Sequence, residues 1–111
     1  SHFMKIDAGN RQLEIGGTQV GRHFRRSHVN TETKYLMLRE AFDSLKAIRV
    51  YFKVDVENLI SQKSILRIGA KHEGTFRNDW ILLDGRKRDC HIYSIIESEW
   101  PTIKARLALL L

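Results

Sequence analysis

Two short groups of polar residues give this sequence its clearest chemical signal. The first starts at Asn58, continues one helical turn later at Ser61, and is followed by Gly69, a residue type that commonly ends a helix. The second is a run in which two arginines lead directly into a predicted helix: Arg25, Arg26, Ser27, His28, Val29, Asn30, Thr31 and Glu32. Free backbone N–H groups at a helix N-terminus bind anions, and adjacent cations strengthen that binding. Together the two groups suggest a phosphate-bearing cofactor held between two helices.

Length, charge and cysteine content limit the possible classes of protein. The 111 residues suffice for one domain, and 42% hydrophobic residues can form a modest core. A net charge of +6 attracts anions, whether nucleic acid, acidic lipid or a polyphosphate cofactor. The single cysteine, Cys90, excludes an intramolecular disulfide, and the five histidines lack the spacing of a metal site. These features lead us to expect no metal and a reducing, cytoplasmic location. No apolar run could span a bilayer, so we also expect no membrane partner.

Hydrophobic periodicity predicts the secondary structure, because alternation marks strands and a spacing of three or four residues marks helices. The predicted elements are strands 3–7 and 12–18, a helix to Leu45 with Asn30 or Thr31 as its N-cap, strand 48–54, helix 58–68 that buries Ile60, Ile65 and Ile68, strand runs 72–76 and 80–83, strand 89–96, and a short helix capped by Ser98. Asp84-Gly85 is a strong hairpin signal before the last strand. A strand-helix-strand unit in the middle requires a parallel crossover. The sequence therefore predicts an α/β fold with a mixed sheet, in the order β-β-α-β-α-β-β-α.

Six fragments extend the two polar groups along the chain. They are Leu13-Glu14-Ile15-Gly16-Gly17-Thr18, the Arg25–Lys34 segment, Ile48-Arg49-Val50, Asp55-x-x-Asn58-x-x-Ser61, Gly69-Ala70-x-x-Glu73-Gly74-x-x-Arg77, and Asp84-Gly85-Arg86-x-Arg88-Asp89 through Tyr93-Ser94-Ile95-Ile96. In this order they resemble the GCN5-related N-acetyltransferases, specifically the ribosomal-protein N-acetyltransferase branch. The resemblance implies the acyl-CoA N-acyltransferase (GNAT) fold, acetyl-CoA as co-substrate and a primary amine as acceptor. It covers only the C-terminal part of the family domain, so residues 1–111 are expected to lack the N-terminal strands and helices.

The resemblance also assigns the residues that would bind the cofactor. The segment from Arg25 to Asn30 would be the pyrophosphate-binding turn, and the cofactor-binding residues would be Arg25, Arg26, Ser27, His28, Val29, Asn30, Thr31 and Asn58, the last at the pantetheine arm. Two positions depart from the family pattern: His28 stands where the family has glycine, and Asn30 stands where glycine or alanine is usual. Because glycine lets the backbone approach a diphosphate closely, the Cβ of His28 is expected either to hinder that approach and weaken cofactor binding, or to require a shifted loop.

Two residues would carry out the catalytic steps in this resemblance. Ser61 would lie near the thioester sulfur and protonate the departing thiolate, and Glu14 would accept the proton of the amine, directly or through water. Reaching the neutral amine at pH 7 costs about 1 kcal/mol for an α-amino group and about 4.6 kcal/mol for lysine, from their reference pKa values. One carboxylate therefore suffices for an N-terminal amine. The simpler alternatives are that Asn58 is only an N-cap, Ser61 an exposed serine and Glu14 a solvated or salt-bridged strand residue.

The acceptor and the assembly state remain open at this point. The acceptor could be a protein N-terminus, such as that of a ribosomal protein, or a small amine. Exposed sheet edges lead us to expect a homodimer or other self-association. A competing interpretation is a non-catalytic basic binding module, in which Phe24, Tyr51, Trp80 and the cations Arg86 to Arg88 contact nucleic acid or an acidic partner. A third is an inactive fragment of a larger acetyltransferase.

Overall fold

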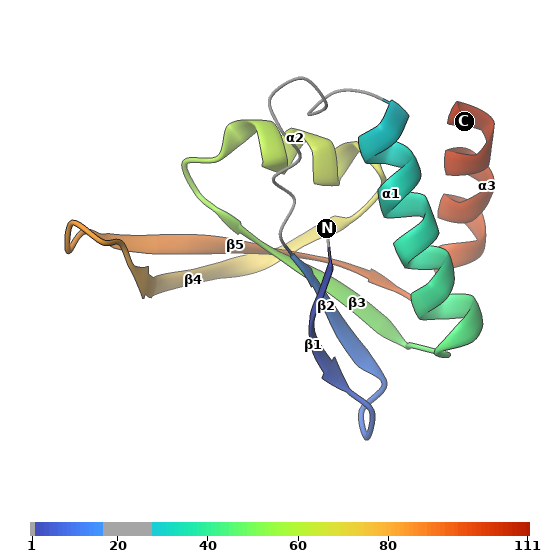
Figure 1. The fold of residues 1–111 in the computed structure, drawn as a ribbon, viewed down its shortest axis with the longest axis horizontal. Helices are drawn as coiled ribbons and strands as arrows, with labels where there is room; N and C mark the ends of the chain where they lie inside the picture. Colours follow the sequence, from blue (N-terminus) through green and yellow to red (C-terminus); the bar gives the residue numbers. More distant parts are fainter. Residues whose placement is uncertain (1, 17–27) are drawn as a thin grey trace.

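The computed structural model describes residues 2–16 and 28–111, which form a sheet of five strands and three helices (Figure 1). The strands are β1 (His2–Asp7), β2 (Gln12–Gly16), β3 (Arg49–Asp55), β4 (Lys71–Ile81) and β5 (Lys87–Ile96), and the helices are α1 (His28–Arg39), α2 (Leu59–Arg67) and α3 (Trp100–Leu110). This order confirms the prediction. The predicted continuation of β2 to Thr18 lies outside the described residues. None of the described helices is long and apolar enough to cross a membrane.

The sheet is mixed, as the sequence predicts. Its strand order is β1-β2-β3-β5-β4. Strands β2 and β3 are parallel and are joined through α1, whereas the other neighbouring pairs are antiparallel. A parallel pair needs a long crossover connection, and α1 supplies it.

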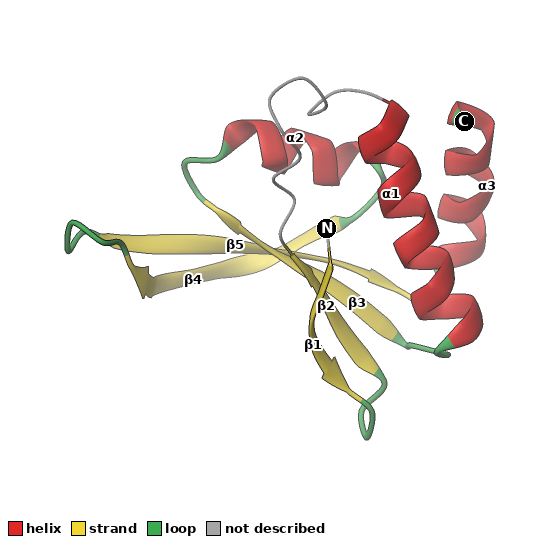
Figure 2. Ribbon diagram, viewed as in Figure 1, coloured by secondary structure: helices red, strands yellow, loops and turns green. Residues whose placement is uncertain are grey.

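The three helices lie on the same side of the sheet and share one core with it (Figure 2). Leu38 of α1, Ile65 of α2 and Leu107 of α3 are fully buried in the same cluster as Val50 and Phe52 of β3. Burial of this apolar area is the main stabilising contribution to such a fold. The opposite face carries no helix in residues 2–16 and 28–111, and there the polar residues Arg49, Lys53 and Asp55 of β3 lie beside Ile96, Ile92 and Cys90 of β5.

Helix α1 differs from its prediction at both ends. It begins at His28, so Asn30 and Thr31 lie inside the helix and do not cap it. At its other end the chain continues as a π-helix over Glu40–Ser44, where the Leu45 N–H donates to the Glu40 carbonyl at 2.9 Å. Periodicity predicted the helical range, but the cap assignment was wrong because several neighbouring residues of this segment are of types that can cap a helix.

The last helix was predicted as short and capped by Ser98, and both points are wrong. Helix α3 has 11 residues, and its N-cap position is Glu99 without a side-chain cap. The Glu99 carboxylate instead accepts the Ile96 N–H at 3.1 Å and pairs with Lys71 at 2.6 Å. In α2, Ile65 and Ile68 are buried as predicted, whereas Ile60 is 38% exposed.

The runs 72–76 and 80–83 belong to one strand, β4, which contains two irregularities in its register with β5 and ends at Ile81. The predicted hairpin follows it. Gly85 has a φ of +88°, and its N–H donates to the Leu82 carbonyl at 2.9 Å. Only glycine adopts such a φ without strain, so Asp84-Gly85 was a reliable turn signal.

Substituting Gly69 by alanine is expected to destabilise the fold by about 1–3 kcal/mol. Gly69 follows α2 with a φ of +107°, and an added Cβ would lie 3.0 Å from the Ile103 side chain of α3. Gly74 in β4 is the matched control, because a Cβ there meets nothing within 4 Å. Urea unfolding of both variants tests this. Equal losses of stability in Gly69→Ala and Gly74→Ala would contradict it.

Lys34 of α1 is only 2% exposed, and burial lowers its pKa from 10.5 to about 8. Between these two values the unfolded chain binds more protons than the folded one, so this group makes stability rise with pH in that window. From pH 8 to 10.5 the stability of the native protein should therefore rise relative to that of Lys34→Met, by at most about 3 kcal/mol. Chemical denaturation across this range measures the difference. A constant difference would show that Lys34 titrates normally.

Candidate functional site

A cleft opens where β2 and β3 separate. The parallel pairing of these strands ends at the pair Glu14–Tyr51, although β2 continues to Gly16 and β3 to Asp55. The cleft has a volume of about 500 Å³, which is within the range of small-molecule sites. Apolar residues from the helix-covered face and polar residues from the opposite face line it: Ile15, Phe52, Val54 and Ile65, and Glu14, Lys53, Asp55 and Asp79. The cleft therefore connects the two faces of the sheet.

Glu14 lies at the point where the strands part, and it is only 4% exposed. Its Oε1 atom has no hydrogen-bond partner among the described residues. Tyr51 is its neighbour across the parallel pair, and burial together with the Glu14 charge raises the pKa of the tyrosine hydroxyl. A buried carboxylate oxygen without a partner is costly, so a donor from outside the described residues, such as a ligand, would stabilise it.

The first turn of α2 brings two further predicted residues to the same cleft. Asn58 and Ser61 both line it, together with Glu14. The Asn58 Oδ1 atom accepts the Ser61 N–H at 3.2 Å, so Asn58 is the N-cap of α2. This bond engages the oxygen of the Asn58 side chain. The structure gives its amide nitrogen no partner within 2–16 and 28–111, which leaves that group available as a donor.

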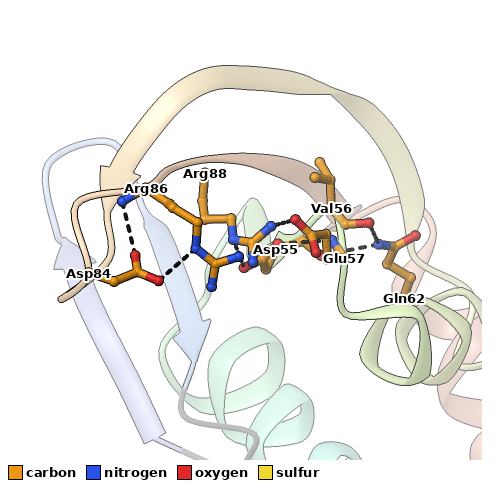
Figure 3. A network of polar contacts seen from close by, with 7 residues as sticks. All are labelled: Asp55, Val56, Glu57, Gln62, Asp84, Arg86 and Arg88. Atoms are coloured by element: carbon orange, nitrogen blue, oxygen red, sulfur yellow. Dashed lines mark hydrogen bonds and ion pairs between the residues drawn. The ribbon is translucent and has the colours of Figure 1, made fainter.

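Polar contacts hold the connection between β3 and α2 in place (Figure 3). Gln62 donates its side-chain N–H to the carbonyls of Asp55 at 3.1 Å and Val56 at 2.8 Å. The Asp55 carboxylate accepts the Glu57 N–H at 2.9 Å. Arg88 of β5 pairs with Glu57, and its Nε lies 3.7 Å from the Asp55 Oδ2. These contacts fix the position of the helix start that presents Asn58 and Ser61.

The same network bears on the nucleic-acid alternative. Arg86 is paired with Asp84 at 2.7 Å, and Arg88 with the two carboxylates of the β3–α2 connection (Figure 3). Cations already neutralised by carboxylates attract phosphates weakly, which disfavours their use as a phosphate-binding patch. Tyr51 and Trp80 lie on different strands, and Phe24 is outside the described residues.

The predicted pyrophosphate-binding residues are described only in part. Arg25, Arg26 and Ser27 lie outside the described residues, whereas His28, Val29 and Asn30 form the start of α1. Thr31, in the first turns of α1, accepts a hydrogen bond from the Arg67 guanidinium at 3.3 Å. The N-terminal part of α1 and the C-terminal end of α2 are therefore neighbours. The structure adds a cation, Arg67, beside the predicted phosphate site.

Sequence reasoning did not assign Lys53, Cys90 or Asp79 to the cleft, nor Tyr51 to a position beside Glu14. Tyr51 and Lys53 alternate with the buried residues of β3, so they share the face of Glu14, a signal that was available. The position of Cys90 at the cleft depends on the register of β5 on β3, which only the structure provides. Asp79 reaches the cleft from the irregular part of β4, which no periodicity predicts. No cluster of residues suited to hold a metal ion occurs in the described part of the chain.

Cys90 is expected to react slowly with thiol reagents while the protein is folded. It is 2% exposed, and burial, followed by the effect of Asp79, raises the pKa of its thiol from 9.0 to about 11. The reactive thiolate is then about 100-fold rarer at pH 8 than for an unperturbed thiol, and labelling should accelerate as the pH rises. Ellman's reagent measures this, with the protein in urea as the control. Equal rates in both states would contradict the prediction.

The structure resembles solved acetyltransferases over nearly its whole length. A candidate acetyltransferase from T. thermophilus is 41% identical with a TM-score of 0.93, and the match covers 98% of this chain and 57% of that protein. A GCN5-related N-acetyltransferase from Brucella melitensis is 33% identical with a TM-score of 0.91, with coverages of 96% and 48%. The microcin C7 self-immunity acetyltransferase MccE, solved with acetyl-CoA and AMP, is 30% identical with a TM-score of 0.73, with coverages of 82% and 49%. No protein-family model and no curated protein matches the sequence.

This chain thus spans about half the length of each of these three proteins. The TM-scores of 0.93 and 0.91 over nearly the whole of this chain confirm the predicted fold class. Both of these similar proteins are acetyltransferases, and one is a GCN5-related N-acetyltransferase. The predicted resemblance to this family is therefore confirmed at the level of the fold. Residues 2–16 and 28–111 have the fold of the GCN5-related N-acetyltransferases.

Proposed function

We propose that this chain is part of an acetyl-CoA-dependent N-acetyltransferase that modifies a primary amine by direct attack. The observation that best supports this is the cleft through the sheet, which holds a buried carboxylate with an unpartnered oxygen beside the start of a helix. An amine and a thioester that approach from opposite faces of the sheet would meet in such a cleft. The MccE neighbour, which was solved with acetyl-CoA, supports acetyl-CoA as the co-substrate.

The residues of the cleft fit the chemistry that an acetyl thioester brings. Acetyl-CoA supplies an activated acetyl group. Glu14 would take the proton of the attacking amine at its free Oε1, and the burial of this carboxylate keeps bulk water from competing for it. Ser61 would donate its hydroxyl proton toward the leaving sulfur. Asn58 would donate from its amide nitrogen to the pantetheine arm, since its oxygen is engaged in the helix cap.

The phosphates of the co-substrate would lie at the N-terminal end of α1. Arg25, Arg26, Ser27, His28, Val29, Asn30 and Thr31 are the residues proposed there, and Arg67 adds a cation that already contacts Thr31. Helix N-termini attract phosphate through their free N–H groups. Acetyl-CoA whose phosphates are bound at this end would extend its thioester arm along α2, toward Ser61.

The acceptor and the setting of the reaction are proposed from the resemblance alone. We propose that the acceptor is either a protein N-terminus, such as that of a ribosomal protein, or a small amine. Self-association through the exposed sheet edges and a cytoplasmic location are parts of the same proposal. A sharp monomer boundary in sedimentation at high concentration would contradict the self-association.

Isothermal titration of the chain with acetyl-CoA tests the proposed function. We expect saturable one-site binding, and we expect Arg67→Gln to weaken it by a few-fold because one phosphate contact is lost. Lys63→Gln, on an exposed position of the same helix, is the matched control. No heat of binding for the native chain would contradict the function. Binding to oligonucleotides alone, lost at high salt, would support the binding module instead.

A further inference from the structure

The irregular part of β4 places an acidic and an aromatic side chain at the cleft. Between the pairs Phe76–Cys90 and Trp80–Arg88, β4 has three residues and β5 has one. The middle residue, Asn78, has a φ of 50°, and its N–H donates to the Asp89 carboxylate at 2.8 Å. The bulge is thus held by a specific contact. Bulges commonly redirect side chains next to binding sites.

Asp79 and Trp80 line the cleft as a result of this bulge. The Lys53 ammonium lies 3.4 Å from the Asp79 Oδ2 and 5.4 Å from the centre of the Phe76 ring, which fixes the carboxylate against β3. Trp80 remains 48% exposed, a large fraction for an indole beside a cavity. Asp79 also lines a second, open cavity of about 890 Å³, which residues 75–79 of β4 and Asp89 of β5 form. Asp79 is therefore shared by the two cavities, and Trp80 follows it in the lining of the cleft.

Glu14 supplies an independent indication that a ligand enters here. Its side chain is more than nine-tenths buried, lines the same cleft, and keeps one oxygen without a partner in the described residues. An amine that arrives as an ammonium ion carries the donors that this oxygen lacks. Two carboxylates, Asp79 at the bulge and Glu14 at the strand separation, therefore mark a path for a cation into the cleft.

We propose that the β4 bulge is the acceptor-recognition element of this protein. The Asp79 carboxylate, whose Oδ2 lies 3.4 Å from the Lys53 ammonium, accepts a hydrogen bond from the ammonium group of the acceptor at its other oxygen. The exposed face of Trp80 packs against an apolar or aromatic group next to that amine. The acceptor class is then a primary amine with a flat or apolar neighbour and no negative charge close by. This proposal rests on the acetyltransferase function proposed above and adds the residues that select its acceptor.

Steady-state kinetics with two matched acceptors test the proposal. Phenylalanine amide and alanine amide both carry an uncharged carboxamide beside the α-amine and differ only in the side chain. We expect the native protein to favour phenylalanine amide by about tenfold in kcat/KM, and Trp80→Leu to lose most of that preference. Asp79→Asn should raise KM for both amides by about tenfold or more, with a smaller change in kcat. Asp84→Asn, in the exposed turn of the same hairpin, is the matched control and should change neither value.

A binding measurement separates this proposal from the function on which it rests. Trp80 and Trp100 give two indole N–H signals in NMR spectra, which the Trp80→Leu variant assigns. Phenylalanine amide added to the coenzyme A complex should shift the Trp80 signal and leave that of the buried Trp100 in place. If acetyl-CoA fails to bind, the acetyltransferase function itself is wrong. If it binds and the amides are turned over equally, are not turned over, or respond alike to Asp79→Asn and Asp84→Asn, the recognition role of the bulge is overturned.

Discussion

The Glu14→Gln variant should lose a factor of about 10² to 10⁴ in kcat, the usual contribution of a general base. The glutamine keeps the size of the side chain but cannot accept the proton of the amine. Acetyl-CoA affinity should stay within about twofold of the native value, because we place the co-substrate phosphates at the start of α1 and away from this strand. Initial-rate assays at saturating acetyl-CoA measure kcat, and calorimetry measures the affinity for acetyl-CoA.

The stability of the same variant gives a second readout. Glu14 is buried with one carboxylate oxygen unpartnered in the described residues, so a neutral amide should leave stability unchanged or raise it by about 1 kcal/mol. Functional sites often retain such unfavourable groups at the expense of stability. Glu40→Gln, an exposed position at the start of the π-helix, is the control for both assays. A variant that is both fully active and less stable than the native protein would show that Glu14 is a structural residue.

Substituting Trp100 by alanine should cost about 3–5 kcal/mol of folding stability. Trp100 begins α3, is 4% exposed, and stacks on Phe42 with ring centres 5.3 Å apart. Its indole N–H donates to the Asp43 Oδ1 at 3.0 Å, which ties α3 to the π-helix after α1. Alanine removes the ring, the stacking and the hydrogen bond together. Since α1 and α3 are neighbours, their packing should loosen as well.

The second tryptophan of the chain is the matched control. Trp80 is 48% exposed on β4, so Trp80→Ala should cost less than about 1 kcal/mol, mostly through strand propensity. Urea denaturation followed by circular dichroism compares the two variants without relying on tryptophan fluorescence. Similar losses for Trp80→Ala and Trp100→Ala would contradict the assignment of Trp100 to the core.

Periodicity and turn chemistry were enough to predict most of the fold. The alternation around Val50 and Phe52 identified β3, and Asp84-Gly85 identified the hairpin before β5, because both signals arise from neighbouring residues. The caps of α1 and α3 were wrong for the opposite reason. Several residues near each start can cap a helix, and tertiary contacts decide, as the pairing of Glu99 with Lys71 shows at α3.

The candidate site was predictable only where it follows strand and helix periodicity. Glu14 sits on a strand and Asn58 and Ser61 on one turn of a helix, so their sequence positions pointed to the residues now found along one cleft. Their chemical roles remain predictions. Asp79 could not be found in this way, because a bulge shifts the register by an amount that the sequence does not encode locally. The alternation of β3 predicted the face on which Lys53 lies, but its contact with Asp79 became known only from the structure.

The most direct test of the central claim is to map acetyl-CoA on the protein by NMR. The claim is that the space between the separating ends of β2 and β3 receives the thioester. Titration of isotope-labelled protein should shift the backbone amides of Gly16, Val54 and Ser61 together, in proportion to the fraction bound. Shifts that spare these three amides while the ligand binds elsewhere, such as along the β4–β5 hairpin, would contradict the account.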